Sequence, residues 1–245
     1  MLEKIKETQI AILGVCLLLG VVIASTVLSG ALMASRHDDV LTVTGSASQM
    51  ISSDHASWDC GIARQSSSLQ TAYAALADDL KTVKAYLVKN GFAESDLQVS
   101  GIERNELNGH DDHGNATNQI DAYILRQTIH VESDDVKKID AIARQSTELM
   151  AQGIGFTSNA PQYTYSKLDD MKIDMIGKAT QNAKVRAESM AKNTGNEIGP
   201  LRSASTGVFH ITAPNSTDVS DEGISDTSSI AKKITAVISA TFAIR

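Results

Sequence analysis

The chain has 245 residues and only two cysteines, and its 22 basic residues against 29 acidic ones give a net charge of −7. This acidic balance argues against a nucleic-acid partner, because phosphate binding requires a basic patch. The 16 glycines, 3 prolines and 42% hydrophobic residues exclude the collagen-like, disordered and disulfide-scaffold classes.

The N-terminal end of the chain is strongly apolar. No charged residue lies between Glu7 and Arg36, a run of 28 positions. As a helix, residues 10–34 would measure about 37 Å, which exceeds the hydrocarbon thickness of a bilayer. Lys4 and Lys6 precede this run and favour a cytoplasmic N-terminus.

The sequence therefore predicts a cytoplasmic tail (1–9), a single-pass transmembrane signal anchor (10–34) and an extracytoplasmic domain (35–245). The protein would sit in the cytoplasmic (inner) membrane, with the domain on the periplasmic or extracellular side. Two alternatives stay open for the apolar segment. One is cleavage of a signal peptide at Ser29-Gly30-Ala31, although the run is long for a signal. The other is lipidation at Cys16, where the preceding residue is a poor match.

Two predicted strands and an amphipathic helix follow. β-branched residues favour a strand over Val40–Ala47, and alternation of apolar and polar residues favours a second over Ala56–Ala63. Trp58 and Cys60 fall on the apolar face of the second strand, so both are expected in the core. Apolar residues at helical spacing predict a helix over Leu69–Lys89.

The residue pattern in the middle of the chain predicts a hairpin and a second helix. Strands are predicted over Leu97–Arg104 and Tyr123–Glu132, with a polar loop over Asn108–Asn118 between them. Ser133-Asp134-Asp135 caps a helix whose apolar stripe continues to Leu149. A strand over Ile154–Tyr165 follows, interrupted at its proline.

The last third predicts a long helix, a strand, a polar loop and a terminal strand. Small residues recur every fourth position in the helix over Lys167–Thr194, where they allow close approach, most simply of the protein's own sheet. The remaining elements are Leu201–Thr212, Ala213–Ser229 and Ile234–Ile244. The order β-β-α-β-β-α-β-α-β-β predicts an α+β fold of antiparallel sheets packed with amphipathic helices.

Several of these segments resemble the SIMPL-domain family over roughly residues 40–245. The opening strands LTVTGSASQ and SSDHASWDCGI are similar to its start, and the terminal ITAVISATFAI fits its last strand. The closest correspondence is an alanine-rich helix that ends in a glycine turn, carried by Tyr163, Leu168, Lys172, Ala179, Ala183, Arg186, Ala187, Gly195 and Gly199.

The resemblance implies a fold rather than a chemistry, because its motifs are mainly glycines and alanines. Bacterial members are periplasmic or surface proteins, some of them immunogenic or linked to envelope or oxidative-stress defence. One branch forms large ring-shaped homo-oligomers with a central channel. This chain departs from that branch in its long apolar head, which favours a membrane-tethered version.

The best metal-like cluster in the sequence is His110-Asp111-Asp112-His113. Two imidazoles with carboxylates between them could bind Zn²⁺, so His110, Asp112 and His113 are candidate ligands. A solvated polar loop explains the same residues, and a zinc site would need a further ligand and fixed orientation. The sequence thus predicts no metal, no cofactor and no catalytic residue.

Two other polar segments have alternative interpretations. The loop 213–229 carries four acidic residues, but their spacing does not fit a calcium loop, so it is a candidate interaction segment. Asp54-His55 with Ser52 and Ser53 supplies the residue types of a catalytic triad. Adjacent strand residues point to opposite faces, which argues against that role.

The sequence favours a noncatalytic, membrane-anchored domain that forms homo-oligomers and has an envelope or stress-related role. Its partners would be the membrane and further copies of itself, with the loops 108–118 and 213–229 as contact segments. The alternative is a metal- or small-molecule-binding module, with or without enzymatic activity, that uses the His110–His113 loop. An envelope chaperone is a third possibility.

Overall fold

The structure is a computed structural model of the 245-residue chain, and it describes residues 14, 17–29, 39–110 and 113–245. The chain divides into two compact units. Unit 1 comprises Met1–Ser46, Ala179–Gly207 and Ile238–Arg245, and unit 2 comprises Ala47–Lys178 and Val208–Val237. The boundaries of these units fall within three long elements, β1 (Val40–Ser52), α4 (Leu168–Asn193) and β11 (Ala231–Ile244).

Unit 2 contains a six-stranded antiparallel sheet with the order β3-β5-β2-β6, in which β4 also pairs with β5 and β7 with β2. The central pair is β2 with β5, in register from Ala56 opposite Ser133 to Ser66 opposite Tyr123. The six strands are β2 (His55–Ser66), β3 (Leu97–Val99), β4 (Glu103–His110), β5 (Ala116–Ser133), β6 (Phe156–Ser158) and β7 (Gln162–Thr164).

The core of unit 2 lies between this sheet and the helices α2 (Leu69–Lys89) and α3 (Val136–Gln145). Trp58 and Cys60 are buried there, as their alternation predicts. The side chain of Ser68 caps α2 by accepting a hydrogen bond from the backbone N–H of Thr71, which satisfies one unpaired donor of the first turn. Gly91, at φ 89°, follows the end of the helix.

In unit 1, α4 packs on strands of a five-stranded sheet with the order β1-β11-β9-β10, to which β8 (Ile198–Thr206) adds by pairing with β11. The four alanines of the predicted stripe are all buried. Two of them, Ala179 and Ala183, approach Gly45 of β1 so closely that a Cβ there would lie 2.6 Å from the Cβ of Ala183. The small-residue stripe therefore packs on the protein's own sheet, as expected.

Within unit 2, this sheet also contains β9 (His210–Thr212) and β10 (Ile224–Ser225), besides the residues of β1 and β11 that belong to that unit. β9 pairs antiparallel with β11, and β10 pairs parallel with β9. This short parallel pair makes the sheet mixed, whereas the sequence predicted antiparallel strands throughout. Ile211 and Ile234 lie opposite each other and are buried on one face.

The α+β class is confirmed, but three predicted segments differ in detail. Polar residues predicted as the loop 108–118 extend the strands instead, because β4 continues to His110 and β5 begins at Ala116. The strand predicted over Leu97–Arg104 divides into β3 and the start of β4. The strand predicted over Leu201–Thr212 divides into β8 and β9. By contrast, the interruption predicted at Pro161 is confirmed, because β6 ends before this residue and β7 begins after it, and proline cannot donate a backbone hydrogen bond to the sheet.

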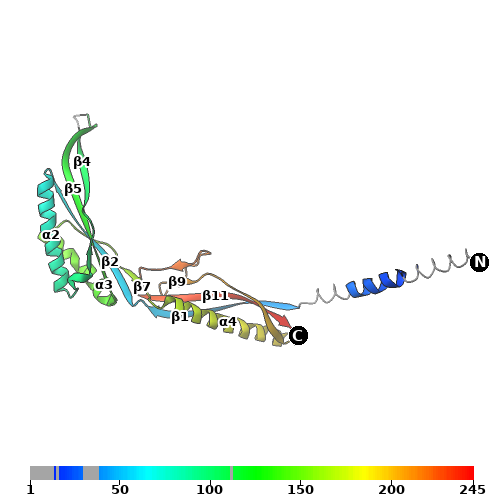
Figure 1. Ribbon diagram of the computed structural model, residues 1–245. Helices are drawn as coiled ribbons and strands as arrows, with labels where there is room; N and C mark the ends of the chain where they lie inside the picture. The colour runs from blue at the N-terminus through cyan, green and yellow to red at the C-terminus, as the bar shows by residue number, and fades with distance from the viewer. Residues whose placement is uncertain (1–13, 15–16, 30–38, 111–112) are drawn as a thin grey trace, which may run out of the picture. The chain divides into compact units, whose positions relative to one another are not determined.

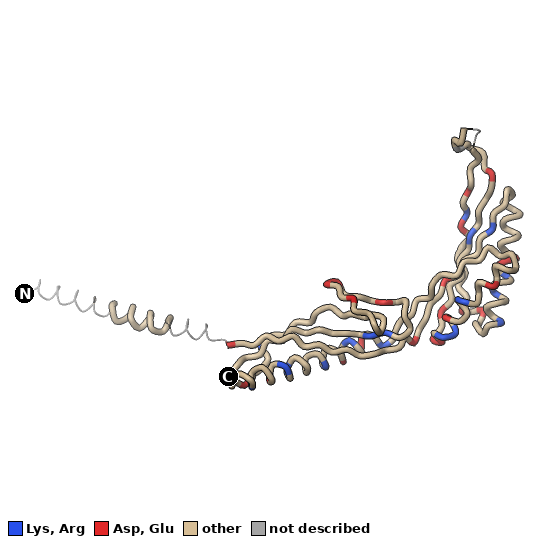
Figure 2. Tube along the Cα trace, turned by 180° about the vertical axis from the view of Figure 1, so that it is seen from behind, with Lys and Arg blue, Asp and Glu red and all other residues tan. Residues whose placement is uncertain are grey.

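Of the predicted membrane anchor, residues 14 and 17–29 are described and are helical, with the leucine, valine and isoleucine side chains of 17–29 exposed. No charged residue lies among them (Figure 2). Residues 10–13, 15–16 and 30–34 of that segment lie outside the described residues. Among the described residues, no helix is both long and apolar enough to cross a membrane.

Candidate functional site

The predicted metal cluster is only partly described. His110 is the last residue of β4 and lies opposite Ala116, so it belongs to a strand and not to a loop. His113 lies in the turn that follows, while Asp111 and Asp112 lie outside the described residues. Within the described ranges, no three histidine, cysteine or acidic residues come together as a metal site would require.

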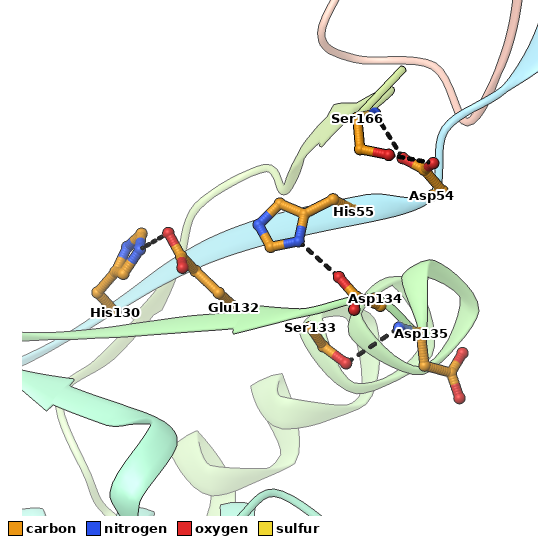
Figure 3. A network of polar contacts seen from close by, with 8 residues as sticks. All are labelled: Asp54, His55, His130, Glu132, Ser133, Asp134, Asp135 and Ser166. Carbon is orange, nitrogen blue, oxygen red and sulfur yellow. Dashed lines mark hydrogen bonds and ion pairs between the residues drawn. The ribbon is translucent and has the colours of Figure 1, made fainter.

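The candidate triad residues at the start of β2 do not meet. His55 Nδ1 lies 2.9 Å from Asp134 Oδ1, whereas both oxygens of Asp54 accept hydrogen bonds from Ser166. Figure 3 shows His55 turned toward Asp134 and Asp54 paired with Ser166. The hydrogen bonds from Ser166 lower the pKa of Asp54. Asp54 therefore holds the start of β2 to the segment after β7 and does not orient His55.

A second histidine stands between two carboxylates on the face of the sheet opposite the helices. His130 on β5 lies directly across from Asp59 on β2, and Glu132 follows on the same side of β5. The ring Nδ1 is 2.7 Å from Asp59 Oδ1 and Nε2 is 3.1 Å from Glu132 Oε1 (Figure 3 shows the second contact). The three side chains are between 31% and 50% exposed.

The chemistry of this cluster follows from its hydrogen bonds. An imidazole can donate from both nitrogens only when it is protonated, and carboxylates at both nitrogens favour that form. The hydrogen bonds to Glu132 and Asp59 accordingly raise the pKa of His130. In this arrangement neither nitrogen keeps a free lone pair for a metal or for proton abstraction. Asp59, His130 and Glu132 therefore link β2 and β5 electrostatically, and we call these three residues the clasp.

The cysteine in unit 2 is unreactive by position. Cys60 is fully buried, and burial raises the pKa of its thiol to about 12. The nucleophilic form of cysteine is the thiolate, and with this pKa almost no thiolate is present near neutral pH.

The polar atom of Trp58 is satisfied within the core. Its indole N–H donates to Ser158 Oγ and to the carbonyl of Asn159, both at 3.1 Å.

The residues that carry the sequence resemblance have structural contacts. The hydroxyl of Tyr163 donates to Asp140 Oδ1 at 3.0 Å, and its carbonyl accepts from the buried Lys232 at 2.6 Å. Arg186 donates from Nη1 to the carbonyl of Thr44 at 3.1 Å. Gly195 adopts φ 79°, a conformation that favours glycine where α4 ends.

The structure is thus an α+β fold in which an alanine-lined helix packs on a glycine-containing strand, and the described motif residues hold elements together. One family of known proteins matches it. Residues 41–242 match the SIMPL family, whose description is "Protein of unknown function (DUF541)". Because this match covers most of the chain, the protein belongs to the SIMPL family. A search of curated proteins finds no match.

Sequence reasoning missed the clasp of Asp59, His130 and Glu132. The alternation in Tyr123–Glu132 placed His130 and Glu132 on the polar face of their strand, and the alternation in β2 did the same for Asp59. Their meeting depends on the register of two strands that are 71 residues apart at these positions. A strand-pairing prediction would have been the only available signal.

Proposed function

We propose that this SIMPL-family protein is a noncatalytic, membrane-anchored extracytoplasmic protein that self-assembles and serves the cell envelope. The main support for a membrane anchor is the run from residue 8 to residue 35, which contains no charged residue. Its described part is helical with outward apolar side chains, such as Leu18 at 67% and Val27 at 67% exposed. Exposed apolar surface of this extent is unfavourable in water and favourable in hydrocarbon.

The support for self-assembly is the β4–β5 ribbon of unit 2. Figure 1 shows the two strands extending past α2 as a two-stranded ribbon. In the described residues, β5 pairs with β2 from Tyr123 onward, and before that residue it pairs only with β4. A two-stranded ribbon is marginally stable in water by itself.

The ribbon also exposes apolar side chains. Leu107 and Ile120 are 41% and 37% exposed, although both belong to strands that would normally bury such residues. Packing of this surface against another copy would remove apolar area from water and cover unpaired strand edges. The ribbon is therefore the proposed contact surface between copies.

Membrane orientation is tested by cysteine labelling in spheroplasts. With Cys16→Ser as the background, Glu3→Cys marks the tail and Lys137→Cys marks an exposed site on α3. A membrane-impermeant maleimide should label Lys137→Cys in intact spheroplasts and label Glu3→Cys only after lysis. Cys60 needs no replacement because it is buried and its pKa is raised to about 12. The reverse labelling pattern, or release of the protein by a carbonate wash, contradicts the proposal.

Assembly is tested by light scattering of the detergent-solubilised full-length protein. We expect a defined oligomer at micromolar concentration, and a monomer would contradict self-assembly. The double variant Leu107→Lys with Ile120→Lys should dissociate the oligomer while the fold is retained. The control is Met150→Lys, which changes an exposed apolar residue outside β4 and β5 and should leave the oligomer intact.

A further inference from the structure

Four elements of unit 1 meet at the end where the chain arrives from the predicted anchor. Figure 1 shows β1 beginning there and β11 and α4 ending there. The backbone N–H of Ile244 donates to the carbonyl of Asp39 at 2.8 Å, which joins the end of β11 to the residue before β1. Glu197, just before β8, exchanges two backbone hydrogen bonds of 2.8 Å with Arg245. We call this surface, residues 39–41, 190–202 and 242–245, the β1 end.

Large apolar side chains are exposed at the β1 end. Val40 on β1 is 44% exposed, Met190 on α4 is 50% exposed and Leu201 on β8 is 47% exposed. Among the described residues of unit 1 beyond the anchor segment, Val185 is the only other large apolar side chain that is comparably exposed. Exposed apolar side chains from three separate elements thus gather at one end, an arrangement that is unfavourable in water and typical of a contact surface.

The chain that links this end to the predicted anchor is short. The predicted span ends at residue 34, and β1 is preceded by Asp39. Even a fully extended backbone covers at most about 18 Å between these two residues. The headgroup layer outside the hydrocarbon is itself about 5–8 Å thick. If the anchor spans the membrane, the β1 end is therefore within reach of the membrane interface, whatever the conformation of the residues between them.

The charge of unit 1 permits such a contact. Residues 39–46, 179–207 and 238–245 carry five basic and three acidic residues, whereas unit 2 carries 14 basic and 23 acidic residues. Unit 1 is therefore not repelled by anionic lipids. At the β1 end, Lys192, Arg202 and Arg245 can extend their charged groups toward phosphates. Asp39 and Glu197 lie there as well, so apolar contact has to provide most of the binding.

We propose that the β1 end of unit 1 binds the surface of the phospholipid bilayer that the anchor spans. Val40, Met190 and Leu201 would enter the boundary between headgroups and acyl chains, and Lys192 and Arg202 would bind phosphate oxygens. This inference rests on the membrane anchor of the proposed function. It adds a second attachment, so that unit 1 is held in one orientation at the membrane instead of hanging from a tether.

The test is fluorescence quenching on the full-length protein in vesicles of phosphatidylcholine and phosphatidylglycerol. Part of the phosphatidylcholine carries a nitroxide quencher near its headgroup. In the Cys16→Ser background, a bimane probe is attached at Asn193→Cys, an exposed position at the β1 end. The matched position is Thr206→Cys, which is exposed at the other end of β8, about 17 Å beyond Leu201. We expect the nitroxide lipid to quench the Asn193 probe at least about twofold more strongly than the Thr206 probe.

The apolar contacts are tested by the double variant Val40→Ser with Leu201→Ser. It should reduce quenching of the Asn193 probe to the level of the Thr206 probe. The control is Val185→Ser, which changes a 51% exposed apolar residue of α4 outside the β1 end and should leave the quenching unchanged. Thermal unfolding followed by circular dichroism checks that each variant is folded.

Flotation of the vesicles after a carbonate wash distinguishes failure of this inference from failure of the anchor. A chain that floats with the vesicles, but whose Asn193 probe is quenched no more than its Thr206 probe, would overturn the membrane contact and leave the anchor standing. A chain that stays at the bottom of the gradient contradicts the anchor and the contact together. Equal quenching in the wild type and in the double variant would show that Val40 and Leu201 do not form the contact surface.

Discussion

The backbone N–H of Ser46 donates a 3.2 Å hydrogen bond to the side-chain oxygen of Asn182, so a helix residue takes the place that a neighbouring strand would occupy beside β1. One turn further along α4, Arg186 donates to the carbonyl of Thr44 at 3.1 Å. β1 stands at the end of its sheet, and no other strand of the described residues pairs with its outward backbone groups. Helix α4 thus satisfies two of these groups and blunts an edge that carries no charged residue.

Removal of these two side chains should expose the edge of β1. We expect Asn182→Ala with Arg186→Ala to lower the free energy of unfolding by about 1–2 kcal/mol, because each hydrogen bond contributes about 1 kcal/mol. The variant should also aggregate faster with a cross-β signature, measured by thioflavin T fluorescence below the melting temperature. Lys184→Ala on the same helix changes an exposed residue and should match the wild type in both measurements.

The second prediction concerns Gly45, where β1 contacts α4. Alanine at Gly45 would overlap the backbone of Ala179 and Ala183, and neither the helix nor the strand backbone can move without loss of packing. We expect Gly45→Ala to destabilise the protein by about 3 kcal/mol or more in urea denaturation. Gly177→Ala is the matched control, because it lies in α4 with open space around it. There, alanine should stabilise the helix by up to about 1 kcal/mol.

The ion pair between β2 and α2 provides a third prediction. Arg64 contacts the buried Asp79 with two hydrogen bonds, one of them 2.6 Å from Nη2 to Oδ1, and this carboxylate raises the pKa of Arg64. We expect Asp79→Ala to lower the free energy of unfolding by about 3 kcal/mol, because it leaves a guanidinium unpaired against the core. The apolar double variant Arg64→Met with Asp79→Leu should recover most of this loss.

The control for that pair is its neighbour in sequence. Asp78 on α2 is 77% exposed at its side chain and pairs with the exposed Lys81 at 3.3 Å. Asp78→Ala should change stability by less than about 0.5 kcal/mol in the same thermal and urea unfolding measurements. Equal losses for Asp78→Ala and Asp79→Ala would show that burial of Asp79 contributes nothing.

The parts of the fold that could be predicted from sequence are those that local periodicity determines. Trp58 and Cys60 were placed in the core because they alternate with Ser57 and Asp59, and the alanine stripe was assigned to the protein's own sheet because its period fits one helix face. The end of the β4–β5 ribbon, residues 108–118, was predicted as a loop because it is polar and contains glycine. A strand whose two faces are both exposed lacks the alternation of apolar and polar residues that identifies a half-buried strand.

The candidate sites could not be predicted for a different reason. His110 and His113 were singled out because they are close in sequence, whereas His55 and His130 each contact a carboxylate from a distant part of the chain. Asp134 is 79 residues from His55, and Asp59 is 71 residues from His130. Register between strands decides such meetings, and single-sequence patterns carry no register information.

The clasp at His130 makes stability depend on pH. Because Glu132 and Asp59 raise the pKa of His130 above its ordinary value of 6.5, the folded state binds a proton more tightly than the unfolded state. This stabilisation is therefore fully present below about pH 6.5, and it is lost as the pH rises through the raised pKa. Its size should be about 1 kcal/mol at most, since these side chains are partly exposed and water screens them.

The measurement is urea denaturation of the wild type and His130→Gln at about pH 5.5 and about pH 8.5, on either side of this range. The difference in unfolding free energy between the two proteins should be larger at the lower pH. The control removes both carboxylates with Asp59→Asn and Glu132→Gln and then compares this double variant with the triple variant that also carries His130→Gln. Without the carboxylates, the difference in unfolding free energy between these two variants should not increase toward low pH. A difference that grows toward high pH instead would mean that the folded state prefers the neutral imidazole, which is the opposite of what two carboxylates at hydrogen-bond distance require.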